Sequence, residues 1–229
     1  MRFAAQVIRF FFPLFVLANF AVADNVAPAP VKAPTAIEEG KQYEVISGAN
    51  KPVPGAKVEI TEMFWYGCGH CYAFEPILEP WLKKLPADVK FTRSPAIWPT
   101  RRPGLPEDMM KTHAKLYYTA VAMNAVEKLH QPIFDAMQKD SKNMIDDAEI
   151  SAVVSAAGVD GAKFLATMKS FAIGAQVTQA DARQKAFQVT GTPEIVVANY
   201  YKISATNAGG QKEMLDVADF LIKKLQAAK

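Results

Sequence analysis

The sequence has few of the residues that bind metals or build a framework of disulfides. Its 229 residues include two cysteines and three histidines. A structural zinc site normally needs four protein ligands, and this chain has no second cysteine pair at ligand spacing. Several disulfides are excluded by the same count. The two cysteines therefore act as a single pair, Cys68 and Cys71.

An excess of charge of one sign is also missing. The chain has 26 Lys and Arg residues against 23 Asp and Glu residues, a formal net charge of +3. Because no basic stripe stands out from this balance, the sequence gives no reason to expect a nucleic-acid partner. Half of the residues are hydrophobic, which is enough to bury a sizeable core.

No apolar run has the length that a membrane span needs. The run from Phe10 to Phe20 is short, follows the positive charges of Arg2 and Arg9, and leads to the small residues Ala21-Val22-Ala23. These features predict a cleavable export signal over residues 1–23. An uncleaved anchor or an ordinary core helix is the alternative.

The spacing of the cysteine pair indicates a redox role. In an exported protein, two cysteines most often form one structural disulfide. A bridge across two intervening residues, however, closes so short a loop that it removes little entropy from the unfolded chain. A bond in such a loop suits repeated formation and reduction. We therefore interpret Cys68-Gly69-His70-Cys71 as a redox-active motif.

The order of strands and helices predicts an α/β fold with a mixed sheet flanked by helices. The periodicity predicts strands over residues 43–46, 58–64, 90–93, 195–198 and 200–204, and long helices over 171–189 and 216–226. A compact block between these parts is expected to be entirely helical. The predicted division is a Pro- and Ala-rich linker at 24–36, a discontinuous domain at 37–100 and 169–229, and a helical insertion domain at 101–168.

The position of the motif assigns different roles to its members. Cys68 follows a strand and begins a helix, where free backbone N–H groups and the helix dipole stabilise a thiolate. Cys71 lies one turn inside the helix and is shielded. His70 is expected to add a positive or donor group near Cys68, or else to be a surface residue without a role. His113 and His130 are expected on helix surfaces.

A carboxylate is predicted on the apolar face of the strand before the motif. Glu62 alternates with Val58, Ile60 and Phe64 by the two-residue period of a strand. Since burial of an unpaired carboxylate is costly, we expect a function, namely carrying the Cys71 proton with a pKa raised by burial. A tolerated polar residue at a strand edge is the alternative.

Thr192-Pro193 lies between a helix end and a strand. This is a natural place for a cis peptide bond, although an ordinary trans loop proline is the alternative. In the cis form, the turn would present the backbone of Thr192 for strand-like pairing with a substrate peptide.

These motifs together resemble the DsbA family of periplasmic thiol:disulfide oxidoreductases, which have a thioredoxin fold. The resemblance rests on FWYGCGHCYAFEP, a helical block, GTPEIVV and a closing strand and helix, and it covers nearly all of the chain after the linker. It implies a thioredoxin-like domain with Cys68 as the nucleophile, Cys71 as the resolving thiol and Glu62 as the buried carboxylate. It also implies that Thr192-Pro193 is a cis-proline turn facing the active site.

The resemblance further implies a substrate class and a partner. Reduced exported proteins would be oxidised in the periplasm, and a DsbB-like quinone-linked membrane oxidase would restore the disulfide. We expect a monomer, with no cofactor beyond the redox-active disulfide. Two departures from the family pattern bear on oxidising strength. Gly69 stands where the best-known member has proline, and Glu194 follows Pro193, where it would oppose the Cys68 thiolate, point to solvent or bind basic substrates.

Two other functions stay open at this point. A disulfide isomerase or reductase would use the same thiolate chemistry with a different redox partner. A peptide-binding chaperone would use Trp65, Tyr66 and Trp98 as an apolar groove and keep the cysteine pair as a structural disulfide.

Overall fold

The computed structural model of the chain describes residues 36–53, 55–100 and 103–227. The predicted export signal and nearly all of the predicted linker lie outside the described residues. Within the described part, no helix is both long enough and apolar enough to cross a membrane.

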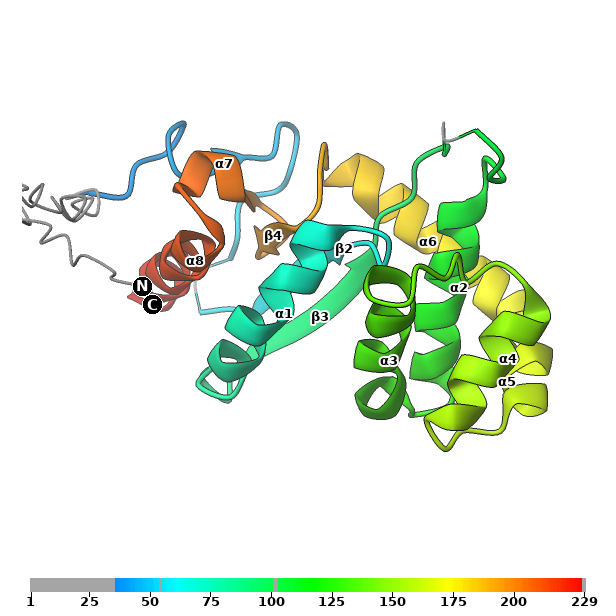
Figure 1. Ribbon diagram of the computed structural model, residues 1–229. Coiled ribbons are helices and arrows are strands. Elements are labelled where there is room, and N and C mark those ends of the chain that lie inside the picture. The colour runs from blue at the N-terminus through cyan, green and yellow to red at the C-terminus, as the bar shows by residue number, and fades with distance from the viewer. Residues whose placement is uncertain (1–35, 54, 101–102, 228–229) are drawn as a thin grey trace, which may run out of the picture. The chain divides into compact units, whose positions relative to one another are not determined.

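The described residues form one mixed sheet of five strands in the order β1-β5-β4-β2-β3 (Figure 1). Strands β2 and β3 are parallel, while the pairs β2–β4, β4–β5 and β1–β5 are antiparallel. The predicted mixed sheet is thus confirmed, and β2 has the predicted bounds. The strands are β1 (Glu44–Val45), β2 (Val58–Phe64), β3 (Val89–Pro95), β4 (Glu194–Val197) and β5 (Tyr201–Ser204).

Helices make up most of the remaining described chain. Asp146 and Asp160 cap two of them, because their side-chain oxygens accept hydrogen bonds from backbone N–H groups of the first turn. The final helix begins earlier than predicted, at Gln211. The helices are α1 (Gly69–Leu82), α2 (Met109–Ala122), α3 (Val126–Gln138), α4 (Asp147–Ala156), α5 (Gly161–Met168), α6 (Phe171–Ala186), α7 (Ala205–Ala208) and α8 (Gln211–Ala227).

Strand alternation gives the sheet two buried faces. Ile60 and Ile195 pack on one face with Phe74 of α1 and Leu221 of α8. Met63, Val196, Phe187 and Val189 are among the residues that form a smaller cluster on the other face. Adjacent positions on β2 and β4 therefore point into different surroundings, which matters for the two carboxylates described below.

Helices α2 to α5 form a group beside the sheet, to the right in Figure 1. Their core includes Leu129 and Phe164 and continues into Phe64 and Cys71 of the motif region. Ile173 of α6 belongs to the same core. The helical group thus packs directly on the cysteine motif, while the predicted domain boundaries at residues 101 and 168 stay predictions.

Candidate active site

The cysteine motif lies at the junction of strand, turn and helix that the sequence predicts. Strand β2 ends at Phe64, and Cys68 is the N-cap of α1 with its sulfur accepting the Cys71 N–H at 3.4 Å. The first turn of α1 carries no acidic side chain to offset the helix dipole. Gly67 is needed in the turn because a Cβ there would collide with the Trp65 ring.

The surroundings of Cys68 lower its pKa to about 5. The largest cause is its hydrogen bond with the Cys71 side chain; partial burial opposes it, and the Thr192 side chain and the backbone N–H groups of Cys71 and His70 add to it. An ordinary cysteine has a pKa near 8.5. Cys68 is therefore a thiolate at neutral pH and is reactive as a nucleophile.

Cys71 has the opposite environment. Its side chain is fully buried, and burial raises its pKa well above the ordinary value. The hydrogen bond with Cys68 and the charges of Cys68 and Glu62 act in the same direction. In this dithiol state, Cys71 therefore keeps its proton and donates it toward the Cys68 sulfur.

The Thr192-Pro193 turn comes from 124 residues further along the chain to meet Cys68. The peptide bond is cis, as predicted, and Cys68 Sγ lies 3.3 Å from the Thr192 carbonyl oxygen, which accepts a hydrogen bond from the thiol when Cys68 is protonated. A groove of about 600 Å³ runs beside this contact, and His70, Pro193 and Gln211 are among the residues that line it.

His70 is exposed at the start of α1. Its carbonyl accepts a hydrogen bond from Gln211 Nε2 at 2.6 Å, and its backbone N–H helps to lower the pKa of Cys68. The contribution to Cys68 that the structure describes therefore comes from the His70 backbone. The role expected of the imidazole stays a prediction.

Glu62 is fully buried on the face of β2 that α1 covers. The expectation of an unpaired carboxylate is wrong, because Arg93 Nε donates to Glu62 Oε2 at 3.0 Å. The parallel register of β2 and β3 places these two residues side by side. The other oxygen, Oε1, has no hydrogen-bond partner among the described residues. Burial raises the pKa of Glu62 to about 8 despite the opposing charge of Arg93.

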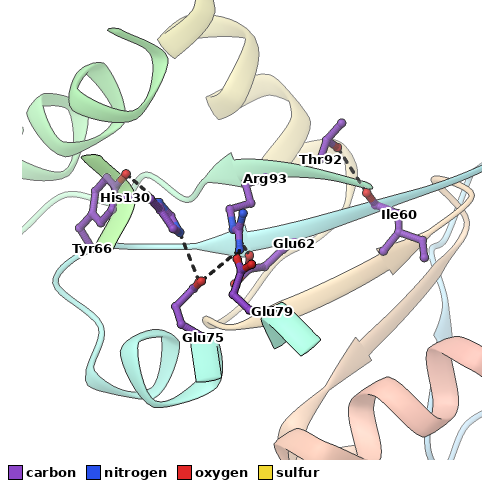
Figure 2. Close-up of polar contacts among 8 residues, drawn as sticks. All are labelled: Ile60, Glu62, Tyr66, Glu75, Glu79, Thr92, Arg93 and His130. Atoms are coloured by element: carbon purple, nitrogen blue, oxygen red, sulfur yellow. Dashed lines mark hydrogen bonds and ion pairs between the residues drawn. The ribbon is translucent and has the colours of Figure 1, made fainter. Parts of the chain in front are cut away.

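Arg93 is the centre of an acidic cluster, which we define as Glu62, Glu75 and Glu79 around its guanidinium (Figure 2). Arg93 Nη2 contacts Glu75 Oε2 at 3.0 Å and Glu79 Oε1 at 2.8 Å. Burial disfavours the charged form of Glu75, but hydrogen bonds from His130 and Arg93 lower its pKa overall. With one cation for three carboxylates, Glu62 is the member that holds a proton at neutral pH.

His130 extends this cluster to the turn before Cys68. Its Nε2 lies 3.3 Å from Glu75 Oε1, and its Nδ1 lies 2.9 Å from the Tyr66 hydroxyl (Figure 2). Because ionised Glu75 accepts the Nε2 proton, Nδ1 must accept from Tyr66. Burial lowers the pKa of His130, so the ring is neutral.

His113 binds the neighbouring residue of the same turn. Trp65 Nε1 donates to His113 Nδ1 at 2.8 Å, so Nε2 carries the proton and donates to the Asn143 carbonyl, also at 2.8 Å. Burial lowers the pKa of His113 to about 4.

The expectation that both histidines lie on helix surfaces is wrong, since His113 and His130 are buried. The sequence held a signal for His113, which lies three residues after Met110 and four before Tyr117 in the apolar stripe of α2. Both rings tie the active-site turn to the helical group.

Of the three alternatives for Glu194, pointing to solvent is wrong, because the residue is 3% exposed. Its Oε1 accepts hydrogen bonds from the backbone and hydroxyl of Thr190 and from the Gly191 N–H. Burial raises its pKa. Among the described residues, no group of three or more His, Cys, Asp or Glu side chains is arranged to hold a metal ion.

Comparison with known proteins gives consistent matches. The family model of the DSBA-like thioredoxin domain matches residues 98–219. The thiol:disulfide interchange protein DsbA of Pseudomonas syringae pv. tomato is 39% identical over 214 residues, covering 93% of this chain and 96% of the relative. That of Pseudomonas aeruginosa is 40% identical over 192 residues, or 82% and 86%.

Solved structures agree with these sequence matches. The crystal structure of Pseudomonas aeruginosa DsbA superposes with a TM-score of 0.72 at 39% identity, covering 84% of this chain and 96% of that chain. The oxidoreductase NmDsbA1 of Neisseria meningitidis superposes with a TM-score of 0.69 at 25% identity, covering 85% and 96%.

Proposed function

Because the chain belongs to the DsbA family and is therefore a protein thiol:disulfide oxidoreductase, we propose that its reaction proceeds through Cys68 and Cys71. In the oxidised protein, a substrate thiolate attacks the sulfur of Cys68, the disulfide breaks, and Cys71 leaves with the electron pair. A second substrate thiolate then attacks the substrate sulfur of the mixed disulfide and releases Cys68 as a thiolate. The substrate is oxidised by two electrons and the protein is reduced.

The observation that carries this proposal is the contrast between the two thiols. Cys68 is partly exposed with a pKa lowered to about 5, whereas Cys71 is buried with a raised pKa. A stabilised Cys68 thiolate favours the reduced form and makes the disulfide a stronger oxidant. This supports donation of the disulfide to reduced proteins as the direction of the reaction.

Glu62 is proposed to supply the proton that Cys71 needs when it leaves as a thiolate. The raised pKa keeps a proton on Glu62 at neutral pH, and the charge of Glu62 is among the causes that raise the pKa of Cys71. The oxygen of Glu62 without a protein partner is the one available to a bridging water. In the reverse, reoxidation direction, Glu62 takes the Cys71 proton.

The remaining site residues are proposed to bind substrate. Thr192 and Pro193 lie beside Cys68 and line the adjacent groove, where the extended backbone of a substrate would pair with residue 192. His70 lines the same groove. Its exposed imidazole is proposed as a donor to the Cys68 thiolate or to the substrate.

The setting proposed for this reaction follows from the sequence. Residues 1–23 would direct export to the periplasm, the linker would precede the thioredoxin-like domain, and residues 101–168 would form its helical insertion domain. Reduced exported proteins are the proposed substrates of a monomeric enzyme that needs no cofactor besides its disulfide. A DsbB-like quinone-linked membrane oxidase is the proposed partner for reoxidation.

Alkylation of the fully reduced protein tests the proposal. At about pH 5, an ordinary thiol is almost entirely protonated, so only Cys68 should react rapidly with iodoacetamide. A redox titration with glutathione should give a potential more oxidising than that of thioredoxin, about −270 mV. An unreactive Cys68 would indicate a structural pair. Faster recovery of scrambled than of reduced substrate would indicate an isomerase.

A further inference from the structure

Glu194 is a buried carboxylate that the reaction above does not use. It is the first residue of β4, directly after the cis Pro193, and its backbone pairs with Met63 of β2 and Ser204 of β5. A position in the middle of the sheet holds this backbone firmly on both sides. The side chain lies on the face of the sheet away from α1, with Lys202 as the neighbouring cation and Glu44 beyond it.

The Glu194 side chain reaches back across the turn to the residues before it. Its Oε1 accepts the Gly191 N–H at 3.1 Å, the Thr190 hydroxyl at 3.1 Å and the Thr190 N–H at 3.3 Å. Its Oε2 is buried and has no partner among the described residues. One oxygen atom thus closes a ring from residue 190 to residue 194.

Thr192 lies inside this ring, between two fixed points. Gly191 is held by the carboxylate on one side, and Glu194 is held by the sheet on the other. Thr192 in turn lies against Cys68, with its carbonyl oxygen 3.3 Å from Cys68 Sγ. The carbonyl oxygen accepts from the protonated thiol, whereas the Thr192 side chain is among the groups that lower the pKa of Cys68. A second hydrogen bond holds the chain just before this ring, where Lys202 Nζ donates to the Gln188 carbonyl at 2.7 Å.

We propose that Glu194 is a positioning residue whose Oε1 holds residues 190 and 191, so that Thr192 stays against Cys68 and the Cys68 thiolate stays stabilised. This inference rests on the proposed function of Cys68. A positioning role means that Glu194 lowers the pKa of Cys68. The charge of Glu194 acting alone would raise that pKa. The groups that dominate the Cys68 pKa are Cys71, Thr192 and the helix N–H groups.

Two substitutions of Glu194 separate the two effects. Glu194→Leu removes the acceptor and should raise the pKa of Cys68 by about half a unit to one unit. Glu194→Gln keeps an acceptor oxygen at the same place and should raise it by less than half as much. Thiolate absorbance during acid titration measures the pKa. The reduction potential of the Leu variant should fall by about 15 to 30 mV, since a tenfold change in the redox equilibrium constant corresponds to 29.6 mV for a two-electron couple.

Other outcomes would overturn the inference. A lower Cys68 pKa in both variants would overturn it, because it would show that the charge of Glu194, or the Thr192 carbonyl that it holds, acts against the Cys68 thiolate. No change in the Leu variant, or an equal rise in both, would show that the acceptor oxygen does not hold Thr192. The control is Glu59→Gln, which neutralises a half-buried carboxylate near the start of β2 that pairs with Lys90, and it should leave the Cys68 pKa unchanged.

A measurement on the unaltered protein covers the case in which the Leu variant does not fold. The Gly191 amide should exchange with solvent deuterium at least about tenfold more slowly than a free amide, because Glu194 accepts its hydrogen bond. Exchange of this amide at the rate of a free amide would refute the hydrogen bond from Gly191 to Glu194 and with it the inference. If Cys68 itself is unreactive in the unaltered protein, the proposed function fails first, and the two failures are thereby distinguished.

Discussion

Cys68 and Cys71 are three residues apart, yet their surroundings are built in different ways. The environment of Cys68 is mainly local, since its pKa is lowered most by the Cys71 side chain of the same helix, and further by one contact from Thr192 and by the N–H groups of the helix start. The environment of Cys71 is assembled from distant segments, with Glu62 on β2 linked to Arg93 on β3 and through Glu75 to His130 on α3. Cys68 is available for reaction, whereas Cys71 is kept protonated near the buried carboxyl group of Glu62.

This difference explains how one short motif performs two steps. A nucleophile must be exposed and ionised, and here the Cys71 side chain, Thr192 and the helix N-terminus together favour the ionised form of Cys68. A resolving thiol must be shielded from substrate and must exchange a proton away from bulk water. The helical group provides the shielding, because its core includes Cys71 and Tyr66.

Removing each cysteine in turn gives the largest expected effects and the clearest test of the two roles. Cys68→Ala should abolish oxidation of a reduced peptide, because no attackable disulfide or accessible thiolate remains. Cys71→Ala should also lose turnover but should accumulate mixed disulfides with substrates through Cys68, since the resolving thiol is absent. Non-reducing gels with mass spectrometry detect these adducts. Adducts through Cys71 in the Cys68→Ala variant would reverse the assignment.

The Cys71 side should be the more sensitive of the two regions to loss of a charge. Arg93→Met leaves Glu62 and Glu75 buried without their cation, so the free energy of unfolding should fall by about 3 kcal/mol at neutral pH. Urea unfolding followed by circular dichroism measures it. The loss should shrink in acid, where the carboxylates take up protons.

A neighbouring ion pair provides a matched control for Arg93. Lys90 lies on the same strand and pairs with Glu59 at 2.8 Å, but its side chain is 67% exposed. Lys90→Met should therefore cost less than about 1 kcal/mol. An equal loss of unfolding free energy in the two variants would show that burial does not determine how much the acidic cluster contributes to stability.

The same contrast between local and distant contacts determines what the sequence could predict. The strand, turn and helix around Cys68 could be predicted because consecutive residues form them, and the bounds of β2 were predicted correctly. The cis Thr192-Pro193 bond was likewise predictable from its place between helix and strand. Arg93 was placed on a strand, but its contact with Glu62 depends on the parallel register of β2 and β3, which no local pattern specifies.

The errors on histidines and on Glu194 have the same physical origin. His130 is buried because α3 packs against the turn before Cys68, and that packing joins segments more than sixty residues apart. Glu194 was judged by its charge, whereas its geometry depends on the return of the chain from α6 to β4. Polar residues in a core are satisfied by partners that only the folded chain brings near.

Glu62→Gln tests whether Glu62 exchanges a proton with Cys71. The variant keeps the shape of the side chain but cannot exchange a proton, so oxidation of a reduced peptide at neutral pH should slow by about tenfold. Stopped-flow kinetics with a fluorescent peptide measures the rate. Acid alkylation of Cys68 should be unaffected, which is the internal control. An unchanged oxidation rate would remove Glu62 from the mechanism.

The same variant should alter how stability depends on pH. Glu62 has a pKa of about 8 in the folded protein against 4.5 in the unfolded chain, so the folded state binds its proton more tightly. Its contribution to stability is full below pH 4.5 and is lost as the pH rises to about 8. Glu62→Gln should therefore flatten the decline of unfolding free energy over this range, measured on the oxidised protein. In the reduced protein the lowered pKa of Cys68 acts in the opposite direction over the same range. A decline as steep as before would place its origin elsewhere.

Thr192→Val gives the smallest expected effect and acts on the Cys68 side alone. Valine keeps the volume and β-branching of threonine but lacks the hydroxyl, so the thiolate loses the stabilisation that the Thr192 side chain provides. The pKa of Cys68 should rise by about half a unit, equivalent to a reduction potential about 15 mV lower. Because Glu62 pairs with Arg93 and not with Thr192, the part of the pH dependence of stability that Glu62 contributes should not change. If the Cys68 pKa stays constant while that pH dependence shifts, the two thiols do not have the separate environments described here.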